Sequence, residues 1–213
     1  EGVLQRGDEQ YDADEQHLGV IERFDRTWTE GGWRRRGMVS ALTLLGLDEM
    51  MARYASYQDL AEIVRHRFAE PRATLRELFA RMLFNVLCGN TDDHARNHSA
   101  FWDGRGLALT PAYDVAPQLR AGGEATQAML ITGGDRTSRV ATCLAGAAAF
   151  LLSPAEAAEM VRRQVTTIRD HWPTIAGEAG LGPVDRNLLW GRALLNPFAF
   201  EGLPPEFADL APQ

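Results

Sequence analysis

The chain has 213 residues, of which 45% are hydrophobic and 24% are charged, proportions typical of a soluble domain that can bury a sizeable core. Its formal net charge of −7 argues against bulk attraction to nucleic acid. No apolar run approaches the ~20 residues that a membrane-spanning helix requires. We therefore expect a cytoplasmic protein that contacts neither a membrane nor nucleic acid directly.

The N-terminal part of the sequence predicts a short β-hairpin followed by a loop. Strands are expected at 3–6 and 17–23, on either side of a polar turn that contains Gly7 and Asp8. Residues 27–36 are expected to form a loop that carries an arginine cluster. This cluster fits either a solvated surface or a contact with a partner protein.

Apolar residues at helical spacing predict the next three elements. Helices are expected at 38–45 and 57–68, and Ser56 is a suitable N-cap for the second of them. A third helix is expected at 74–88, where the apolar residues lie on one face. These residues are Leu75, Leu78, Phe79, Met82, Leu83, Val86 and Leu87.

Capping and turn residues set the limits of this third helix and of the hairpin that follows. Thr74 and Glu77 have the spacing of a capping box at its start, and Gly89 can end it. Two short strands are predicted at 98–103 and 107–110, joined by an Asp-Gly-Arg-Gly turn.

The C-terminal half predicts further helices and a tail. Ser153 and Glu156 form a capping box, with proline at the first helical position. The expected elements are a strand at 125–131, a turn at 132–135, a buried helix at 141–152, a long helix from 154 to 176 and a short helix at 185–195. The predicted fold class is therefore α+β and mostly helical.

Two acids and one amide have the spacing found in phosphoryl-transfer enzymes. In protein kinases a catalytic-loop aspartate accepts the proton of the substrate hydroxyl, an asparagine five positions later binds Mg²⁺, and a later aspartate holds metal at the phosphates. Asp92, Asn97 and Asp114 have this order, and their oxygens are ligands of the kind that Mg²⁺ prefers. A helix, an acidic loop, a hairpin and then an aspartate is the layout of a kinase C-terminal lobe. The sequence therefore favours a kinase with Asp92 as general base.

Three other interpretations stay open. Asp and Asn are common turn residues, so 89–97 could be an ordinary polar loop. Asp92, Asp93 and His94 could belong to a metal-dependent phosphohydrolase, although adjacent residues rarely converge on one ion and no second set completes the site. The chain could also be a pseudokinase-like binding module without activity, against which the retention of all three kinase-type residues argues. Asp93 ranks behind Asp92, because only Asp92 stands five positions before Asn97.

Three motifs together resemble those of HipA-like serine/threonine kinases, the toxins of bacterial type II toxin–antitoxin systems. In chain order they are Ile21-Glu22-Arg23-Phe24-Asp25-Arg26, Thr91-Asp92-Asp93-His94-Ala95-Arg96-Asn97 and Pro111-Ala112-Tyr113-Asp114. Their combination is far more specific than any one of them.

The resemblance implies a kinase-like C-terminal lobe, ATP and Mg²⁺ as cofactors, and a role for each motif residue. Asp92 is implied as the catalytic base, and Asn97 and Asp114 as Mg²⁺ ligands. The implied contacts with the nucleotide, besides these ligands, are Glu22 and Phe24 at the adenine, Asp25 at the ribose, and His94 and Arg96 nearby. For His94, a hydrogen bond that orders the loop is an equally good interpretation. The implied partners are a DNA-binding antitoxin of the HipB type and, as substrate, an aminoacyl-tRNA synthetase.

The sequence departs from the family pattern in two respects. Arg96 stands where the family usually has lysine, and the chain contains no lysine, so the strand lysine that grips the phosphates is absent. No glycine-rich loop precedes the hinge either. We therefore expect the C-terminal part of a longer kinase, inactive by itself. Its expected parts are the end of the N-lobe with the hinge at 1–26, a helical C-lobe at 27–200 and a poorly ordered tail at 201–213.

The remaining cysteine and histidine residues predict no further site. Cys88 and Cys143 have neither zinc-site spacing nor a disulfide framework, and both lie on apolar helical stretches where small buried residues are expected. Structural or surface roles are expected for the other histidines, which are His17, His66, His98 and His171.

Overall fold

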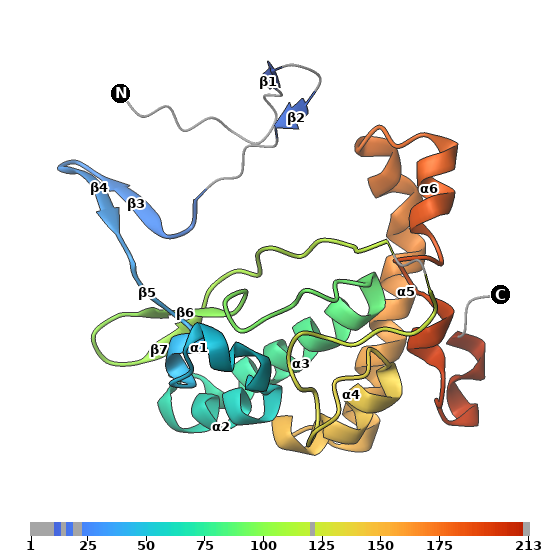
Figure 1. Ribbon diagram of the computed structural model, residues 1–213. Helices are drawn as coiled ribbons and strands as arrows, with labels where there is room; N and C mark the ends of the chain where they lie inside the picture. Colours follow the sequence, from blue (N-terminus) through green and yellow to red (C-terminus); the bar gives the residue numbers. More distant parts are fainter. Residues whose placement is uncertain (1–10, 14–15, 19–22, 120–121, 211–213) are drawn as a thin grey trace.

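The computed structural model describes residues 11–13, 16–18, 23–119 and 122–210 (Figure 1). The strands are β1 (Tyr11–Ala13), β2 (Gln16–Leu18), β3 (Arg26–Thr29), β4 (Gly32–Arg35), β5 (Gly37–Ser40), β6 (Ser99–Trp102) and β7 (Leu107–Leu109). The α-helices are α1 (Ala41–Leu44), α2 (Tyr57–Arg67), α3 (Pro71–Cys88), α4 (Val140–Gly146), α5 (Pro154–Glu178) and α6 (Pro183–Leu189). Short 3₁₀ helices are η1 (Glu49–Tyr54), η2 (Ala147–Phe150), η3 (Pro197–Phe200) and η4 (Pro205–Leu210). The fold is α+β and mostly helical, as predicted.

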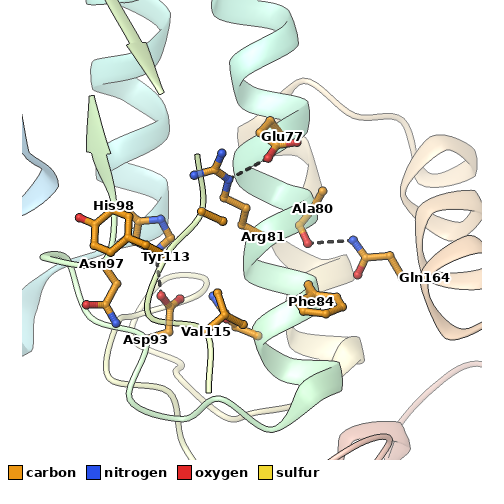
Figure 2. A pocket seen from close by; sticks show the side chains of 12 residues that line it. Glu77, Ala80, Arg81, Phe84, Asp93, Asn97, His98, Tyr113, Val115 and Gln164 are labelled. Atoms are coloured by element: carbon orange, nitrogen blue, oxygen red, sulfur yellow. Dashed lines mark hydrogen bonds and ion pairs between the residues drawn. The ribbon is translucent and has the colours of Figure 1, made fainter. Parts of the chain in front are cut away.

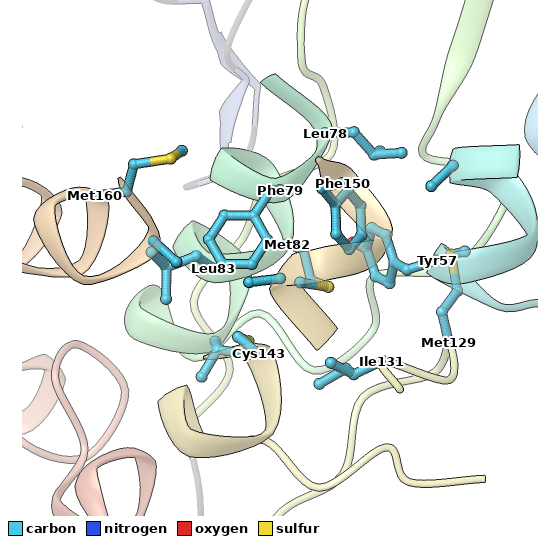
Figure 3. Close-up of a cluster of buried hydrophobic side chains, with 14 of the residues drawn as sticks. Tyr57, Leu78, Phe79, Met82, Leu83, Met129, Ile131, Cys143, Phe150 and Met160 are labelled. Carbon is cyan, nitrogen blue, oxygen red and sulfur yellow. The ribbon is translucent and has the colours of Figure 1, made fainter. Parts of the chain in front are cut away.

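Helix α3 runs through the hydrophobic core and packs against α2, α4, η2 and α5. All seven apolar residues of its predicted face are buried. The rings of Phe79 and Phe150 meet edge to face with centroids 5.4 Å apart, and Met82 and Leu83 lie beside them (Figure 3). Each such side chain stabilises the fold by about 1.5–3 kcal/mol relative to an exposed position. This core fixes the position of the loop that follows α3.

The start of α3 differs from the prediction, whereas its end agrees. The helix begins at Pro71, which needs no N–H partner at the first helical position, and Glu70 makes no side-chain cap. The predicted capping box of Thr74 and Glu77 is therefore wrong, since both residues lie inside the helix. Gly89 ends α3 in the left-handed conformation with φ 73°, as predicted.

Strands β5, β6 and β7 form a three-stranded antiparallel sheet in that order. The predicted hairpin of β6 and β7 is confirmed, and Asp103 Oδ1 accepts hydrogen bonds from the turn N–H groups of Arg105 and Gly106. The helix predicted at 38–45 is wrong over 38–40, because this segment pairs with β6. Only the short α1 follows it, with Ser40 as N-cap.

Residues 27–36, expected as a loop, mostly form the antiparallel hairpin of β3 and β4. Trp28 and Trp33 are directly opposite each other, with ring centroids 5.2 Å apart, and Gly32 adopts φ 103° at the turn. Aromatic and Thr residues favour strands, and a cross-strand aromatic pair stabilises the hairpin. At the N-terminus, β1 pairs antiparallel with β2. The predicted strand at 3–6 and its turn at 7–8 lie outside the described residues.

The predicted strand at 125–131 is wrong, because this segment makes only isolated β-bridges. Its backbone groups bond to different parts of the chain: Leu130 N–H donates to Ala55 C=O at 2.9 Å, and Ala128 N–H to Thr91 C=O at 3.1 Å. The predicted turn at 132–135 is confirmed by the hydrogen bond from Asp135 N–H to Thr132 C=O. The buried helix predicted at 141–152 is α4 followed by η2.

The C-terminal helices agree with the prediction better than the tail does. The capping box of Ser153 and Glu156 opens α5, whereas the last predicted helix is the shorter α6. Residues 201–210, expected to be poorly ordered, instead pack against α5 through η4. Phe207 and Leu210 are buried there, and their burial offsets the entropy lost on ordering the segment.

None of the described helices is long and apolar enough to cross a membrane. Cys88 and Cys143 are both buried, as predicted, and neither forms a disulfide. Burial raises the pKa of the Cys143 thiol to about 12.

Candidate active site

The loop at 89–98 connects α3 to β6 and is held closely on its inner side. Gly89 starts it at a point where a Cβ atom would lie 2.6 Å from the carbonyl oxygen of Ala193, so only glycine fits there. The amide of Asn90 then donates to Asn85 Oδ1 at 3.0 Å and to the carbonyl oxygen of Asp114 at 3.4 Å. Asn90 thereby joins the end of α3, the 89–98 loop and the segment at 111–115.

The adjacent acids of this loop face opposite environments. Asp92 is exposed, whereas Asp93 is 1% exposed. The Asp93 carboxylate accepts a hydrogen bond from the hydroxyl of Tyr57. It also pairs with His98 Nε2 at 2.9 Å (Figure 2). Burial, followed by the charge of Asp93, raises the pKa of Tyr57 well above its ordinary value, which keeps this hydroxyl protonated as a donor. Of the two acids, therefore, only Asp92 faces solvent.

Asn97 stands at the far end of the same loop and is 6% exposed. Its backbone N–H donates to His94 C=O at 2.8 Å, which closes a turn. Its side-chain Nδ2 donates to the carbonyl oxygen of Asp92 at 3.3 Å. Because this hydrogen bond uses the amide nitrogen, the amide oxygen Oδ1 is the atom that can coordinate a cation.

Tyr113 connects the segment at 111–115 to this loop. Its hydroxyl donates to the carbonyl oxygen of Arg96 and therefore accepts from the hydroxyl of Ser99 at 2.6 Å. Burial raises the pKa of Tyr113, which favours the protonated, donating form. Asp114 is exposed and has φ 57°, a left-handed conformation that aspartate tolerates better than most residues. The segments that carry Asp92, Asn97 and Asp114 are thus joined by named hydrogen bonds.

The residues expected at the adenine and ribose are described only in part. Phe24 packs against Tyr113, with ring centroids 5.7 Å apart, and against Phe101 at 6.1 Å. It therefore lies beside the two joined segments. The Asp25 carboxylate pairs with Arg23 at 2.6 Å, and these hydrogen bonds lower the pKa of Asp25. Glu22 lies outside the described residues.

His94 and Arg96, expected near the nucleotide, differ in their contacts. His94 is partly buried, and its Nδ1 has no hydrogen-bond partner in the described part of the chain. The guanidinium of Arg96 pairs with Glu49 of η1 on the exposed surface. Such an exposed pair contributes at most about 1 kcal/mol, so it opposes a move of Arg96 toward a phosphate only weakly.

A cavity of about 210 Å³ lies between this site and α3. One side of the cavity is lined by Asp93, Asn97, His98 and Tyr113, and the other by side chains of α3 and Gln164 of α5 (Figure 2).

Tyr57 is a site residue that the sequence does not predict, because it lies far from Asp93 in the sequence. No motif signals this contact, since it depends on how α2 packs against the loop.

Comparisons with known proteins agree on one family. Residues 7–172 match the family described as the HipA-like C-terminal domain. The protein named "Putative kinase Y4mE" of Sinorhizobium fredii is 27% identical over 157 residues, which are 71% of this chain and 37% of that protein. The serine/threonine-protein kinase toxin HipA of Shewanella oneidensis is 29% identical over 111 residues, which are 45% of this chain and 26% of that protein.

A solved structure of the Shewanella oneidensis HipA, HipB and operator DNA complex contains a chain of the same fold. The TM-score is 0.66 at 20% identity, and the match covers 95% of this chain and 47% of that one. The predicted kinase-like C-terminal fold is thereby confirmed. The chain spans less than half the length of each of these relatives.

Proposed function

The chain belongs to the HipA-like C-terminal domain family, and from this premise we propose that the complete gene product is an ATP- and Mg²⁺-dependent protein serine/threonine kinase. The observation that carries the proposal is the junction of two segments. Tyr113 bonds to the carbonyl of Arg96, and Asn90 bonds to the carbonyl of Asp114. This junction brings the 89–98 loop and the segment of Asp114 together beside Phe24.

Asp92 is proposed as the general base. Its carboxylate takes the proton of a serine or threonine hydroxyl while the hydroxyl oxygen forms a bond to the γ-phosphorus of ATP. The bond from that phosphorus to the β,γ-bridging oxygen breaks, and ADP leaves. Asp93 is a poor candidate for this role, because its carboxylate is buried and already bonded to Tyr57 and His98.

Asn97 and Asp114 are proposed as the protein ligands of Mg²⁺. The amide oxygen of Asn97 and the carboxylate of Asp114 are ligands that suit this ion. Asn97 Nδ2 bonds to the carbonyl of Asp92, and among the described residues no hydrogen bond occupies Asn97 Oδ1 or the Asp114 carboxylate. Mg²⁺, when bound, neutralises the charge that develops on the phosphate oxygens. Because the phosphates and water complete its coordination, two protein ligands are enough.

The nucleotide is proposed to lie over Phe24, with the backbone of Glu22 and Phe24 at the adenine. Asp25 would bond to the ribose while its carboxylate still pairs with Arg23. His94 and Arg96 would face the phosphates, with Arg96 exchanging Glu49 for a phosphate oxygen, since guanidinium binds phosphate through two parallel hydrogen bonds.

The partners are proposals that rest on the relatives. The solved HipA chain is in complex with HipB and operator DNA, which supports a HipB-type antitoxin as the neutralising partner. Family resemblance suggests an aminoacyl-tRNA synthetase as the protein substrate. Contact with DNA would then be made by the antitoxin, in agreement with the net charge of −7.

The test is transfer of labelled γ-phosphate from ATP to a protein hydroxyl by the complete gene product, with casein as a generic acceptor. Asp92→Asn should lower the rate by about 10²- to 10⁴-fold, because a carboxamide cannot accept the proton. Asp170→Asn, an exposed change on α5, is the matched control and should leave the rate unaltered.

Other outcomes would support the competing functions. Hydrolysis of a phosphoester without ATP would indicate a phosphohydrolase. If the complete protein inhibits growth and Asp92→Asn inhibits it equally, a non-catalytic binding module explains the data, and the kinase proposal fails.

A further inference from the structure

Three buried side chains from separate segments meet beneath the 89–98 loop. They are Tyr57 at the start of α2, Asp93 within the loop, and His98 immediately before β6. Tyr57 is 0% exposed, Asp93 1% and His98 3%. The Tyr57 hydroxyl and His98 Nε2 both contact the Asp93 carboxylate and lie 3.1 Å from each other. We call this group the Tyr57–Asp93–His98 cluster.

The hydrogen-bonding pattern of the cluster is determined by its donors. The Tyr57 hydroxyl donates its single proton to Asp93, so the contact between Tyr57 and His98 requires Nε2 as the donor. His98 Nε2 therefore carries a proton that is shared between the Asp93 carboxylate and the Tyr57 oxygen. The Asp93 carboxylate thus accepts two hydrogen bonds in a buried environment, which compensates for its desolvation.

Two residues of the cluster are the immediate neighbours of the two proposed functional residues of the loop. Asp93 follows Asp92 directly, and His98 follows Asn97 directly. The contact between Asp93 and His98 closes the intervening loop from below, which restricts the separation in space of Asp92 and Asn97. The backbone of His98 is fixed as well, since its C=O accepts from Ala41 N–H at 2.7 Å.

The same contact sets the direction in which each functional side chain points. The inward carboxylate of Asp93 turns its neighbour Asp92 to the exposed side of the loop. Asn97 is retained on the inner side, where its Nδ2 bonds to the carbonyl of Asp92. A misplacement of about 1 Å in a catalytic constellation can cost about 100-fold in rate.

We propose that Tyr57, Asp93 and His98 are positioning residues, which hold Asp92 and the Mg²⁺-binding oxygen of Asn97 in their productive geometry without contacting the substrate. This inference rests on the proposed kinase function. It assigns the second aspartate of the loop to a structural bond within the protein and gives Tyr57, which is distant in sequence, a positioning role at the site.

The test uses the complete gene product with Asp93→Asn and, separately, Tyr57→Phe. Phosphate transfer to casein is measured as kcat and as KM for ATP, at a temperature where circular dichroism shows each variant to be folded. For Asp93→Asn we expect kcat to fall about 10- to 100-fold with KM for ATP changed less than twofold. Tyr57→Phe should give a smaller fall in kcat, and the double variant should be no slower than Asp93→Asn alone, because the residues act as one unit.

A second readout does not depend on turnover. Calorimetric binding of ATP is compared with and without Mg²⁺, and the gain in affinity that Mg²⁺ provides should shrink in Asp93→Asn. The matched control is Ser138→Ala, which removes the buried hydrogen bond from Gln127 to Ser138 outside the site. It should leave both kcat and the effect of Mg²⁺ within twofold of the wild type.

The outcomes separate the two proposals. If wild type transfers phosphate and Asp92→Asn does not, while the cluster variants behave like Ser138→Ala, the positioning role is overturned and the kinase function stands. If wild type transfers no phosphate, the kinase function fails and the positioning role fails with it. Tyr57→Phe keeps the ring in the core, so the test remains decisive even if Asp93→Asn does not fold.

Discussion

The 89–98 loop and the 111–119 segment carry the proposed catalytic and metal-binding residues, yet the protein holds them very differently. In the 89–98 loop only Asp92 and Arg96 are exposed. In the 111–119 segment every residue is exposed except the half-buried Tyr113, and the backbone forms no regular structure. The first is fixed by buried side chains. The second is attached through Tyr113, Asn90 and the bond from Gln118 N–H to Gly89 C=O at 3.1 Å.

This difference suggests how the site divides its tasks. A general base must be placed accurately before the reaction, and a rigid loop does so without cost at the moment of reaction. A metal ligand can instead be drawn into place by the ion itself. We therefore expect the 111–119 segment to gain order when Mg²⁺ and nucleotide bind, whereas the 89–98 loop stays as it is.

The largest expected effect on stability is the difference between substitutions of two aspartates, one in each region. Asp93→Ala removes the acceptor of two buried donors and should lower the free energy of unfolding by about 3 kcal/mol. Asp114→Asn, at an exposed position where asparagine tolerates the left-handed backbone, should change it by less than about 0.5 kcal/mol. Urea denaturation of both variants measures this difference. Equal losses would show that the two segments are held alike.

A smaller loss is expected at the start of the loop. Gly89→Ala forces a left-handed alanine, which costs about 1–2 kcal/mol, and also brings Cβ against Ala193. Gly46→Ala has a similar backbone conformation, with φ 67°, but open space around it. The excess loss of Gly89→Ala over Gly46→Ala in thermal unfolding therefore measures how tightly the loop is packed, and no excess would mean that Ala193 moves aside.

For the 111–119 segment the corresponding change is Tyr113→Phe. It removes the hydroxyl that bonds to Arg96 and Ser99 and should lower the free energy of unfolding by about 1 kcal/mol. Proteolysis of the 111–119 segment should become faster as well, while cleavage in the 89–98 loop should not. A segment as resistant as in wild type would mean that other contacts hold it.

The smallest effect lies outside both regions and depends on pH. Hydrogen bonds from the backbone and side chain of Ser153 lower the pKa of Glu156 below its ordinary 4.5, so its stabilising contribution is present above that value and is lost as pH falls through the lowered pKa. Glu156→Gln should therefore melt slightly below wild type at about pH 7, and the difference should shrink toward about pH 3. A difference that is constant with pH would contradict this account.

Local sequence signals predicted the parts of this fold that depend on neighbouring residues. Gly89 as a helix end, the capping box of Ser153 and Glu156, and the turn bonds of Asp103 all act within a few positions, and the structure contains each of them. The spacing of Asp92 and Asn97 identified the candidate loop for the same reason.

Features that depend on distant partners escaped prediction. Met38 and Val39 form a strand because β6 pairs with them, and no residue near them in sequence signals this. The contact between Tyr57 and Asp93 arises only from the packing of α2. The order of residues 201–210 depends on burial of Phe207 and Leu210 against the helical core, which the two prolines in that stretch obscured.

The shielded thiols of Cys88 and Cys143 offer a built-in reporter. A maleimide or iodoacetamide reagent cannot alkylate either buried sulfur until the packing around α3 and α4 opens, so labelling reports this transient opening. At reagent concentrations high enough that the labelling rate no longer rises, that rate equals the opening rate. Because the chain contains no other cysteines, mass spectrometry of the two labelled peptides would time that opening without any engineered probe.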